Sequence, residues 1–130
     1  MDVSTKRATG WINVTSYDSK PYDEALRPPI SQVQVVEEFT GDIVGTGTAC
    51  FLMVVSADGS AHFTGMERFT GKLGDRSGSF ILRNSGTLKD GDLSSEWLVI
   101  PESGTGELSG LRGQGGCRTT EGIFLDYWFE

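Results

Sequence analysis

The chain consists of short runs rich in β-branched and aromatic residues, separated by turn residues at nearly regular intervals. Eight such runs cover residues 9–17, 31–39, 47–56, 60–71, 78–84, 94–100, 105–113 and 121–129. Runs of this length and composition are typical of β-strands. The stretches ADGS, GKLGDR, LKDGDL and GQGG between them supply the glycine and aspartate that tight hairpins require. The pattern therefore predicts an antiparallel meander of about eight strands.

The longest irregular stretch is DSKPYDEALRPPI, residues 18–30. Its three prolines, Pro21, Pro28 and Pro29, interrupt strand pairing, and residues 22–27 have room for no more than a short helical turn. We expect a loop across one mouth of a barrel. Because glycine is unfavourable inside helices and the chain has 18 glycines, no long helix is expected elsewhere.

The distribution of apolar residues on the two strand faces indicates how the sheet closes. In residues 61–69, Ala61, Phe63, Gly65, Glu67 and Phe69 share one face, and neither face is purely polar. The last run is apolar on both faces, with Phe124 and Trp128 opposite Ile123, Leu125, Tyr127 and Phe129. A closed barrel with an interior core and a second copy packed outside accounts for this pattern, so we expect a homo-oligomer.

Size and charge limit the class of protein. With 130 residues, the chain has the length of one domain, here residues 1–130. The net charge of −7 argues against a nucleic-acid partner, which requires a basic surface. There is no run of eighteen apolar residues and no signal-peptide pattern, so we expect no membrane partner and a cytoplasmic location. Cys50 and Cys117 are expected to be free and buried, although they could pair.

The glycine-rich stretch PESGTGELSGLRGQGG, residues 101–116, suggests a phosphate-binding loop but matches neither motif. The dinucleotide fingerprint needs a glycine where Ser109 stands, and the mononucleotide loop needs a lysine and a hydroxyl where Gly116 and Cys117 stand. Glycine inside strands also permits bulges and close approach of neighbouring strands. We therefore interpret these glycines as structural.

Several longer motifs resemble a known family. They are ATGWINVTSYDSKPYDE, FTGDIVGTGTA, FTGMERFTGKLGDRSGSFILRNSG, SEWLVIPESGTGELSGLRGQGG and LDYWFE. Their order is similar to that in a family of small bacterial proteins classified only as a domain of unknown function, whose fold resembles the allene oxide cyclase barrel and, more distantly, the lipocalins. The resemblance implies an all-β, closed antiparallel barrel of about eight strands. This chain has Asn84, Gln114 and Glu102 where histidine, glutamate and glycine, respectively, are common in the family.

Glu67 is the candidate catalytic residue. If its strand face lines the lumen, the carboxyl group lies among aromatic rings, and desolvation would raise its pKa and suit it to general acid or base chemistry. The alternative is a buried structural ion pair with Arg76, Arg83 or Arg112, because buried charges are usually paired. No metal or cofactor is expected, since His62 is the only histidine and no metal-ligand spacing occurs.

A second set of residues is expected to bind a ligand in the lumen or to fill it. The candidate binding residues are Phe51, Met53, Phe63, Trp97, Tyr127 and Arg83, and Trp11 and Phe80 are further large groups for a cavity or core. Small eight-stranded barrels hold either side chains or one small ligand.

Three functions are consistent with these residues. The first is a cofactor-free isomerase, cyclase, lyase or other proton-transfer enzyme acting on a small apolar substrate in the lumen. The second is a carrier or binding module with the same cavity but no catalysis, and the third is a packed structural oligomer. A titratable group with a shifted pKa in an open lumen would favour the enzyme, and a filled lumen would exclude the first two.

Overall fold

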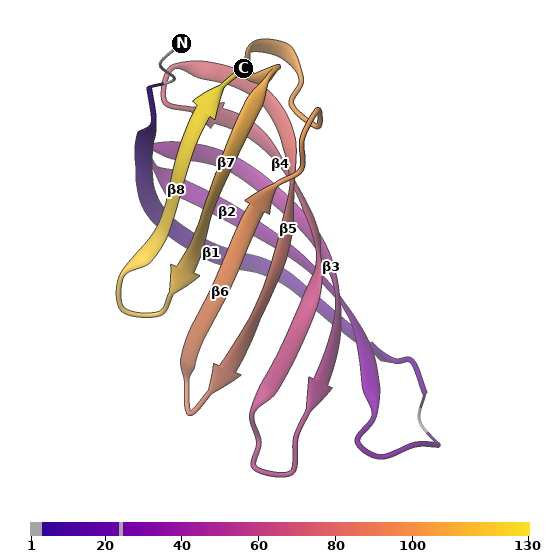
Figure 1. The fold of residues 1–130 in the computed structure, drawn as a ribbon. Coiled ribbons are helices and arrows are strands. Elements are labelled where there is room, and N and C mark those ends of the chain that lie inside the picture. The colour runs from indigo at the N-terminus through magenta and orange to yellow at the C-terminus, as the bar shows by residue number, and fades with distance from the viewer. Residues whose placement is uncertain (1–3, 24) are drawn as a thin grey trace.

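The fold, obtained as a computed structural model that describes residues 4–23 and 25–130, is a closed barrel of eight antiparallel strands in sequence order (Figure 1). Each strand pairs with its neighbours along the chain, and β1 pairs with β8 to close the sheet. The elements are β1 (Lys6–Pro21), β2 (Ile30–Gly41), β3 (Ile43–Val55), β4 (Ala61–Leu73), β5 (Arg76–Lys89), β6 (Asp92–Val99), the 3-10 helix η1 (Gly106–Leu108), β7 (Leu111–Arg118) and β8 (Gly122–Phe129).

The predicted all-β barrel is confirmed, and alternation along the strands places one set of side chains inside. In β4, Ala61, Glu67 and Phe69 are buried inside the barrel, whereas His62, Met66 and Arg68 are exposed on the outer face. Asp90 and Gly91 both have positive φ, 52° and 82°, in the tight turn between β5 and β6. No helix in the described part of the chain is long and apolar enough to cross a membrane.

Two of the element boundaries predicted from the sequence were wrong. The run 105–113 was expected to be a strand and GQGG a turn, but GQGG lies within β7 and residues 106–108 form η1. Strand β7 tolerates these glycines because its neighbours lie close: a Cβ at Gly115 or Gly116 would overlap the carbonyl oxygen of Phe124 or Ser95. The predicted loop at 18–30 is shorter, because β1 continues to Pro21. The helical turn expected at 22–27 includes position 24, which lies outside the described residues.

The two ends of the barrel differ in how completely the sheet closes. Only five residues of β1, Lys6–Gly10, pair with β8, although β1 runs on to Pro21. At this closed end the Arg7 guanidinium makes two hydrogen bonds to the Asp126 carboxylate, at 2.7 and 2.9 Å. The opposite end carries the β1–β2, β3–β4, β5–β6 and β7–β8 connections, and the strands spread apart there (Figure 1). The barrel therefore has a closed end and an open end.

The closed end is filled by the main hydrophobic core. Phe39, Phe69 and Phe80 form a chain of rings with centroid distances of 5.2 and 5.1 Å. Leu108 of η1 is fully buried in the same cluster, because residues 103–107 hydrogen-bond to the part of β5 that β6 does not reach. A second, smaller cluster of Val33, Val35, Ala49 and Phe51 occupies the open half, with Met53 and Phe63 packed against it.

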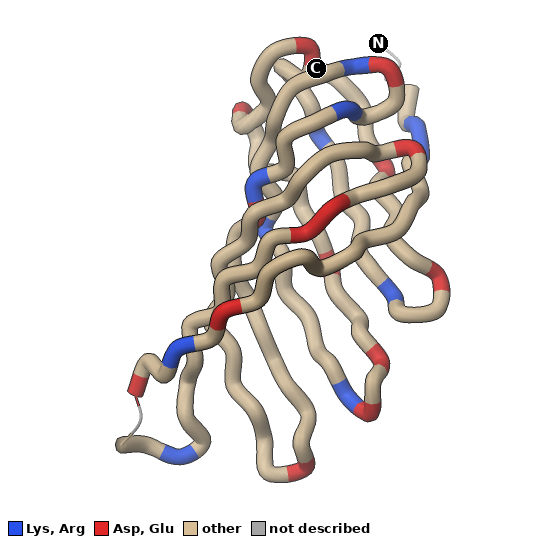
Figure 2. The backbone as a smooth tube through the Cα atoms, turned by 180° about the vertical axis from the view of Figure 1, so that it is seen from behind, with Lys and Arg blue, Asp and Glu red and all other residues tan. Residues whose placement is uncertain are grey.

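Charged residues lie mainly on the outer surface. Seen from behind, Asp and Glu alternate with Lys and Arg over strands and turns, without a continuous basic face (Figure 2). Outward-facing Phe124 and Trp128 of β8 are half-buried within a single chain, and the Arg7 guanidinium lies 4.9 Å from the Phe124 ring centroid. The exposed apolar area at this strand is therefore smaller than the sequence pattern suggested.

Candidate functional site in the barrel lumen

The open half of the lumen contains a cavity of about 220 Å³. It begins where the ring cluster Phe39–Phe69–Phe80 ends and opens near Val14 and Tyr17, which are both exposed. The lining is Ile12, Val14, Tyr17, Val33, Val35, Glu37, Phe51, Met53, Phe63, Asn84, Leu88, Leu93, Ser95, Trp97 and Cys117. Most of these side chains are apolar, and the few polar ones come from β2, β5, β6 and β7.

The structure brings four of the six expected binding residues together. Phe51, Met53, Phe63 and Trp97 line the cavity, and the Phe51 and Phe63 rings meet edge to face at 5.1 Å. The other two lie elsewhere. Tyr127 is buried in the packed core at the closed end, and Arg83 is exposed on the outer face of β5. Of the further large groups, Phe80 belongs to the packed core and Trp11 is exposed outside.

Glu67 is fully buried at the boundary between the packed core and the cavity. Along β4 it lies between Phe69 of the packed core and Phe63 of the cavity. Asn84 donates a hydrogen bond from Nδ2 to Glu67 Oε1 at 3.3 Å. Glu67 itself is not part of the cavity lining, so it lies behind Asn84 and Glu37, which are.

The proposed ion pair of Glu67 with an arginine is wrong. Arg112 pairs with Glu130 at 2.9 Å, the Arg76 guanidinium lies 4.0 Å from the Phe129 ring centroid, and Arg83 faces outward. The charged neighbour of Glu67 is instead a second carboxyl group, that of Glu37. Two carboxylates this close repel each other unless a proton lies between them.

Gly47 makes the approach of the two carboxyl groups possible. It lies on β3 between the strands of Glu37 and Glu67, directly opposite Glu37 in the register. A Cβ at position 47 would overlap Glu67 Oε2 and would lie 2.8 Å from Phe39 Cε1. Only glycine therefore leaves the space that the Glu67 carboxyl group occupies.

Glu67 holds a proton at neutral pH. Burial is the main cause, because it disfavours the charged form, and the hydrogen bond and charge of Glu37 add to it. Together they raise the pKa of Glu67 to about 10, although the Asn84 hydrogen bond acts in the opposite direction. No N–H or O–H group in the described residues donates to Glu67 Oε2. Protonation of the Glu67 carboxyl group removes the repulsion between the two carboxylates.

Two further buried polar atoms beside the cavity lack a hydrogen-bond partner in the described residues. They are Asn84 Oδ1, an acceptor, and Trp97 Nε1, a donor. Both residues line the cavity and are directly opposite each other in the β5–β6 register. Buried polar groups are nearly always hydrogen-bonded, so orphans next to a cavity are natural contacts for whatever fills it.

Cys117 also lines the cavity and carries a thiol group. Burial, followed by the charge of Glu37, raises the pKa of the Cys117 thiol to about 11. The thiol is therefore protonated at neutral pH and is a poor nucleophile. Both cysteines are free, but Cys50 is exposed on the outer face, contrary to the expectation that both are buried.

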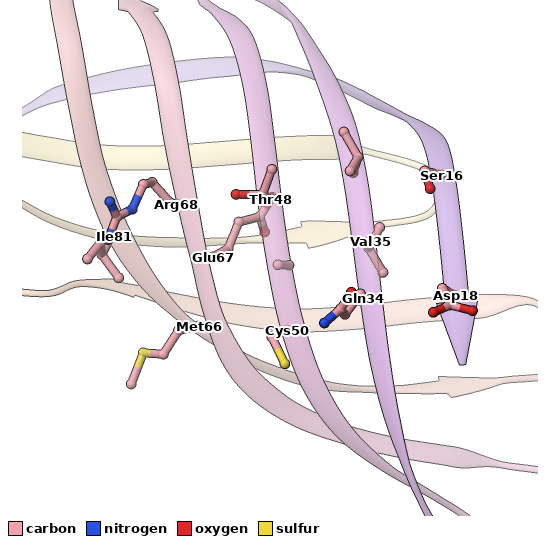
Figure 3. Close-up of a pocket in the computed structure, with 12 residues that line it drawn as sticks. Ser16, Asp18, Gln34, Val35, Thr48, Cys50, Met66, Glu67, Arg68 and Ile81 are labelled. Carbon is pink, nitrogen blue, oxygen red and sulfur yellow. The ribbon is translucent and has the colours of Figure 1, made fainter. Parts of the chain in front are cut away.

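A larger hollow of about 500 Å³ lies over β1–β5, and its lining includes the inward-facing Val35, Ala49 and Glu67 as well as outward-facing residues (Figure 3). Gln34, Cys50, Met66 and Arg68 point into it from successive strands. Most of its side chains are exposed to solvent, as Gln34 and Cys50 are. We place the candidate site in the lumen, where the orphaned polar atoms are.

Sequence reasoning found Glu67 but missed Glu37. The signal was present, because Val33, Val35, Glu37 and Phe39 share one face of a strand by simple alternation. Glu37 is adjacent to Glu38 in the sequence, and two consecutive glutamates suggest that both side chains are exposed to solvent. Which of the two points inward depends on the register of β2, and the structure settles it.

Comparison with known proteins identifies the family. A crystal structure of a protein of unknown function from the DUF3224 family of Shewanella oneidensis MR-1 is similar to this chain, with a TM-score of 0.75 and 25 % sequence identity. The similarity covers 99 % of this chain and 98 % of that one. The search of curated proteins found no match. The family model described as "Protein of unknown function (DUF3224)" matches residues 8–130, so the chain belongs to the DUF3224 family.

Proposed function

We propose that this protein binds a small, mainly apolar molecule in the open half of its lumen. The observation that carries the proposal is a cavity with an apolar wall and unpartnered polar atoms, Asn84 Oδ1 and Trp97 Nε1, beside it. Ligand sites generally combine an apolar lining with a few polar groups that fix orientation. The cavity exceeds the roughly 150 Å³ engineered cavity that accepts benzene, so a molecule with one ring fits.

Methionine methyl groups provide a direct test with an internal control. Met53 lines the cavity, and Met66 is exposed on the outer face. With methyl-labelled methionine, titration with toluene is expected to shift the Met53 resonance and leave Met66 unchanged, because ring currents act only at short range. Equal small shifts of both resonances, or none at saturating toluene, would contradict binding in the lumen.

A matched pair of tryptophan substitutions tests the location further. Leu88 lines the cavity and Leu52 is exposed on the outer face of β3. Leu88→Trp is expected to weaken toluene binding at least about tenfold, since the larger side chain fills space that the ligand needs. Leu52→Trp is expected to change affinity less than twofold, and a comparable loss in both variants would argue against the lumen.

A second candidate function is proton transfer without a cofactor, as in the isomerases and cyclases that the resemblance implies. The observation that favours it is the carboxyl pair at the end of the cavity. Glu37 lines the cavity and would accept a proton from a carbon next to a carbonyl, while the electron pair moves to the carbonyl oxygen. Glu67 would hold its own proton and position Glu37, so it is a positioning residue in this scheme.

Isotope exchange tests this second function without knowledge of the natural substrate. Phenylacetone in deuterated water is expected to exchange its α-hydrogens faster with the wild-type protein than with Glu37→Gln, because the glutamine cannot act as a base. Glu38→Gln, which changes the exposed neighbour, is the matched control and should behave as wild type. Equal exchange rates with wild type and Glu37→Gln would leave only the binding function.

Self-association and compartment remain proposals. We propose a homo-oligomer, supported by the half-exposed Phe124 and Trp128 on the outer face of β8. Light scattering tests it, and a 14.1 kDa species alone at micromolar concentration would overturn it.

The two free cysteines support a reducing compartment such as the cytoplasm.

A further inference from the structure

The charge of the cavity lining restricts the chemistry of a ligand. Among the fifteen lining side chains, Glu37 is the one acidic group, and none is lysine, arginine or histidine. The Cys117 thiol is protonated at neutral pH because burial and the charge of Glu37 raise its pKa. The walls therefore offer one carboxylate and no positive charge to whatever enters.

The hydrogen bonds behind the lining fix which atoms face a ligand. Asn84 uses its Nδ2 group to donate to Glu67, and its Oδ1 atom is left without a donor in the described residues. Asn84 is only 6 % exposed, so this acceptor is not satisfied by bulk water. Burial and the nearby Glu37 raise the pKa of Glu67, which lies behind the lining, so Glu37 is the carboxyl group of the pair that a ligand meets.

Arg118, whose charge acts on the lining residue Cys117, makes hydrogen bonds to backbone carbonyl groups. The Arg118 guanidinium donates from Nη1 to the carbonyl oxygens of Ser95 and Cys117, at 2.8 and 3.0 Å, and does not line the cavity. Within the described residues, no salt bridge neutralises Glu37. A half-buried carboxylate without a cationic partner is costly, and a cation bound beside it would lower that cost.

The aromatic side chains suit the same kind of ligand. Trp97, Phe51 and Phe63 line the same cavity as this carboxyl group, and aromatic faces attract cations. The apolar wall in turn accommodates a hydrocarbon group. An ammonium group has hydrogen-bond donors and no acceptor, which matches the acceptors Glu37 and Asn84 Oδ1, whereas the Trp97 Nε1 donor gains no hydrogen bond from it.

Resting on the lumen-binding function proposed above, we infer that the ligand is a monocation, an apolar group that carries one protonated amine. The amine lies at the polar boundary beside Glu37 and Asn84, and the apolar part extends past Phe51 and Phe63 toward the open end. Carboxylic acids of the same shape are excluded, because they would place a second negative charge beside the carboxyl pair.

Three probes with the same ring and chain test the inference. Isothermal titration calorimetry compares 2-phenylethylamine, 2-phenylethanol and 3-phenylpropanoate at pH 7 and low salt. The amine is expected to bind at least about tenfold more tightly than the alcohol, since a charge-assisted hydrogen bond contributes more than a neutral one. The acid is expected to bind more weakly than the alcohol.

Two substitutions on β2 separate the lumen charge from the overall negative charge of the protein. Glu37→Gln keeps the side-chain shape and removes the cavity charge, and it should reduce the preference for amine over alcohol to less than about threefold. Glu38→Gln removes the same charge from the exposed neighbour and should leave the preference within twofold of wild type.

The outcomes distinguish the two proposals. If the alcohol and the acid bind as tightly as the amine, or if Glu37→Gln retains the full preference, the inference is wrong although the lumen still binds ligands. Equal loss of preference in Glu37→Gln and Glu38→Gln would also overturn it, because general attraction to an acidic protein would then explain the selectivity. If neither toluene nor any of the three probes binds, both the lumen-binding function and this inference are wrong.

Discussion

The closed half of the lumen is filled by packed side chains, whereas the open half of the same barrel contains a cavity. Along β4, Phe69 is fully buried between Phe39 and Phe80, whereas Phe63, three inward positions away, borders a cavity. At the closed end β1 pairs with β8, residues 103–107 cover the part of β5 that β6 does not reach, and the Leu108 side chain of η1 packs into the core. At the open end β1 has left β8, and no comparable segment enters among the described residues. Strand closure, rather than composition, decides which half is hollow.

The two halves should respond very differently to loss of an aromatic ring. Phe69→Ala is expected to lower the free energy of unfolding by about 3–5 kcal/mol, because it leaves a cavity in a close-packed core. Phe63→Ala should cost less than half as much, since its ring already borders empty space. Urea denaturation measures both values. Similar losses in the two variants would mean that the open half is filled in solution.

The boundary between the halves should respond to pH. The pKa of Glu67 is raised in the folded protein, so the folded state binds a proton that the unfolded state releases above about pH 4.5. This contribution to stability is complete below that pH and is lost as pH rises toward the folded pKa, by at most about 1.4 kcal/mol per unit. Glu67→Gln mimics the protonated form. Its stability relative to wild type should therefore increase from pH 5 to pH 9.

Thermal or urea unfolding at several pH values checks this sign. Glu38→Gln, at an exposed position, is the control and should show no such trend. A large loss of stability in Glu67→Gln at every pH would mean that Glu67 is ionised and paired with a cation, as the sequence alone had allowed.

The lumen and the outer face should also differ in thiol chemistry. With iodoacetamide at pH 8, exposed Cys50 should react at least about tenfold faster than Cys117, whose raised pKa keeps the thiolate scarce and whose side chain is buried. Mass spectrometry of the wild type and of Cys50→Ser follows the two sites. Comparable rates would show that the lumen is more open to water than the cavity lining indicates.

The smallest effect is expected at the closing seam. Arg7→Ala removes the hydrogen bonds to Asp126 and the contact with the Phe124 ring. Because Arg7 is exposed, water and salt screen the pair, and the melting temperature should hardly change. Amide hydrogen exchange of Ala8 and Thr9 should nevertheless become faster. A large fall in melting temperature would show that the seam, rather than the packed core, holds the closed end together.

The sequence predicted those features that depend on local patterns. Alternation placed Glu67 and Phe63 on the inner face of one strand, and Asp-Gly pairs marked the hairpin between β5 and β6 correctly. The β7 strand was misplaced, because its glycines look like a turn and only the close approach of neighbouring strands explains them.

The partner of Glu67 could not be predicted. Glu37, Gly47 and Glu67 lie on three different strands, and their contact depends on the register of two strand pairs at once. Arginine was the reasonable partner on general grounds, but every arginine proposed for that role faces outward or lies at the closed end. Gly47 matters because it has no Cβ that would overlap the Glu67 carboxyl group, and this contact can be recognised only once the alignment of the strands is known.

The early departure of β1 from β8 also leaves the barrel with a free sheet edge. Beyond Gly10, no strand in the described part of the chain pairs with that side of β1, whereas the free part of β5 is covered by residues 103–107. Unprotected edges recruit other strands and promote aggregation. Here the edge is interrupted by a bulge between Val14 and Ser16, and it continues through Asp18 and Lys20 to Pro21. The open mouth is thus compatible with a chain that does not polymerise edge to edge.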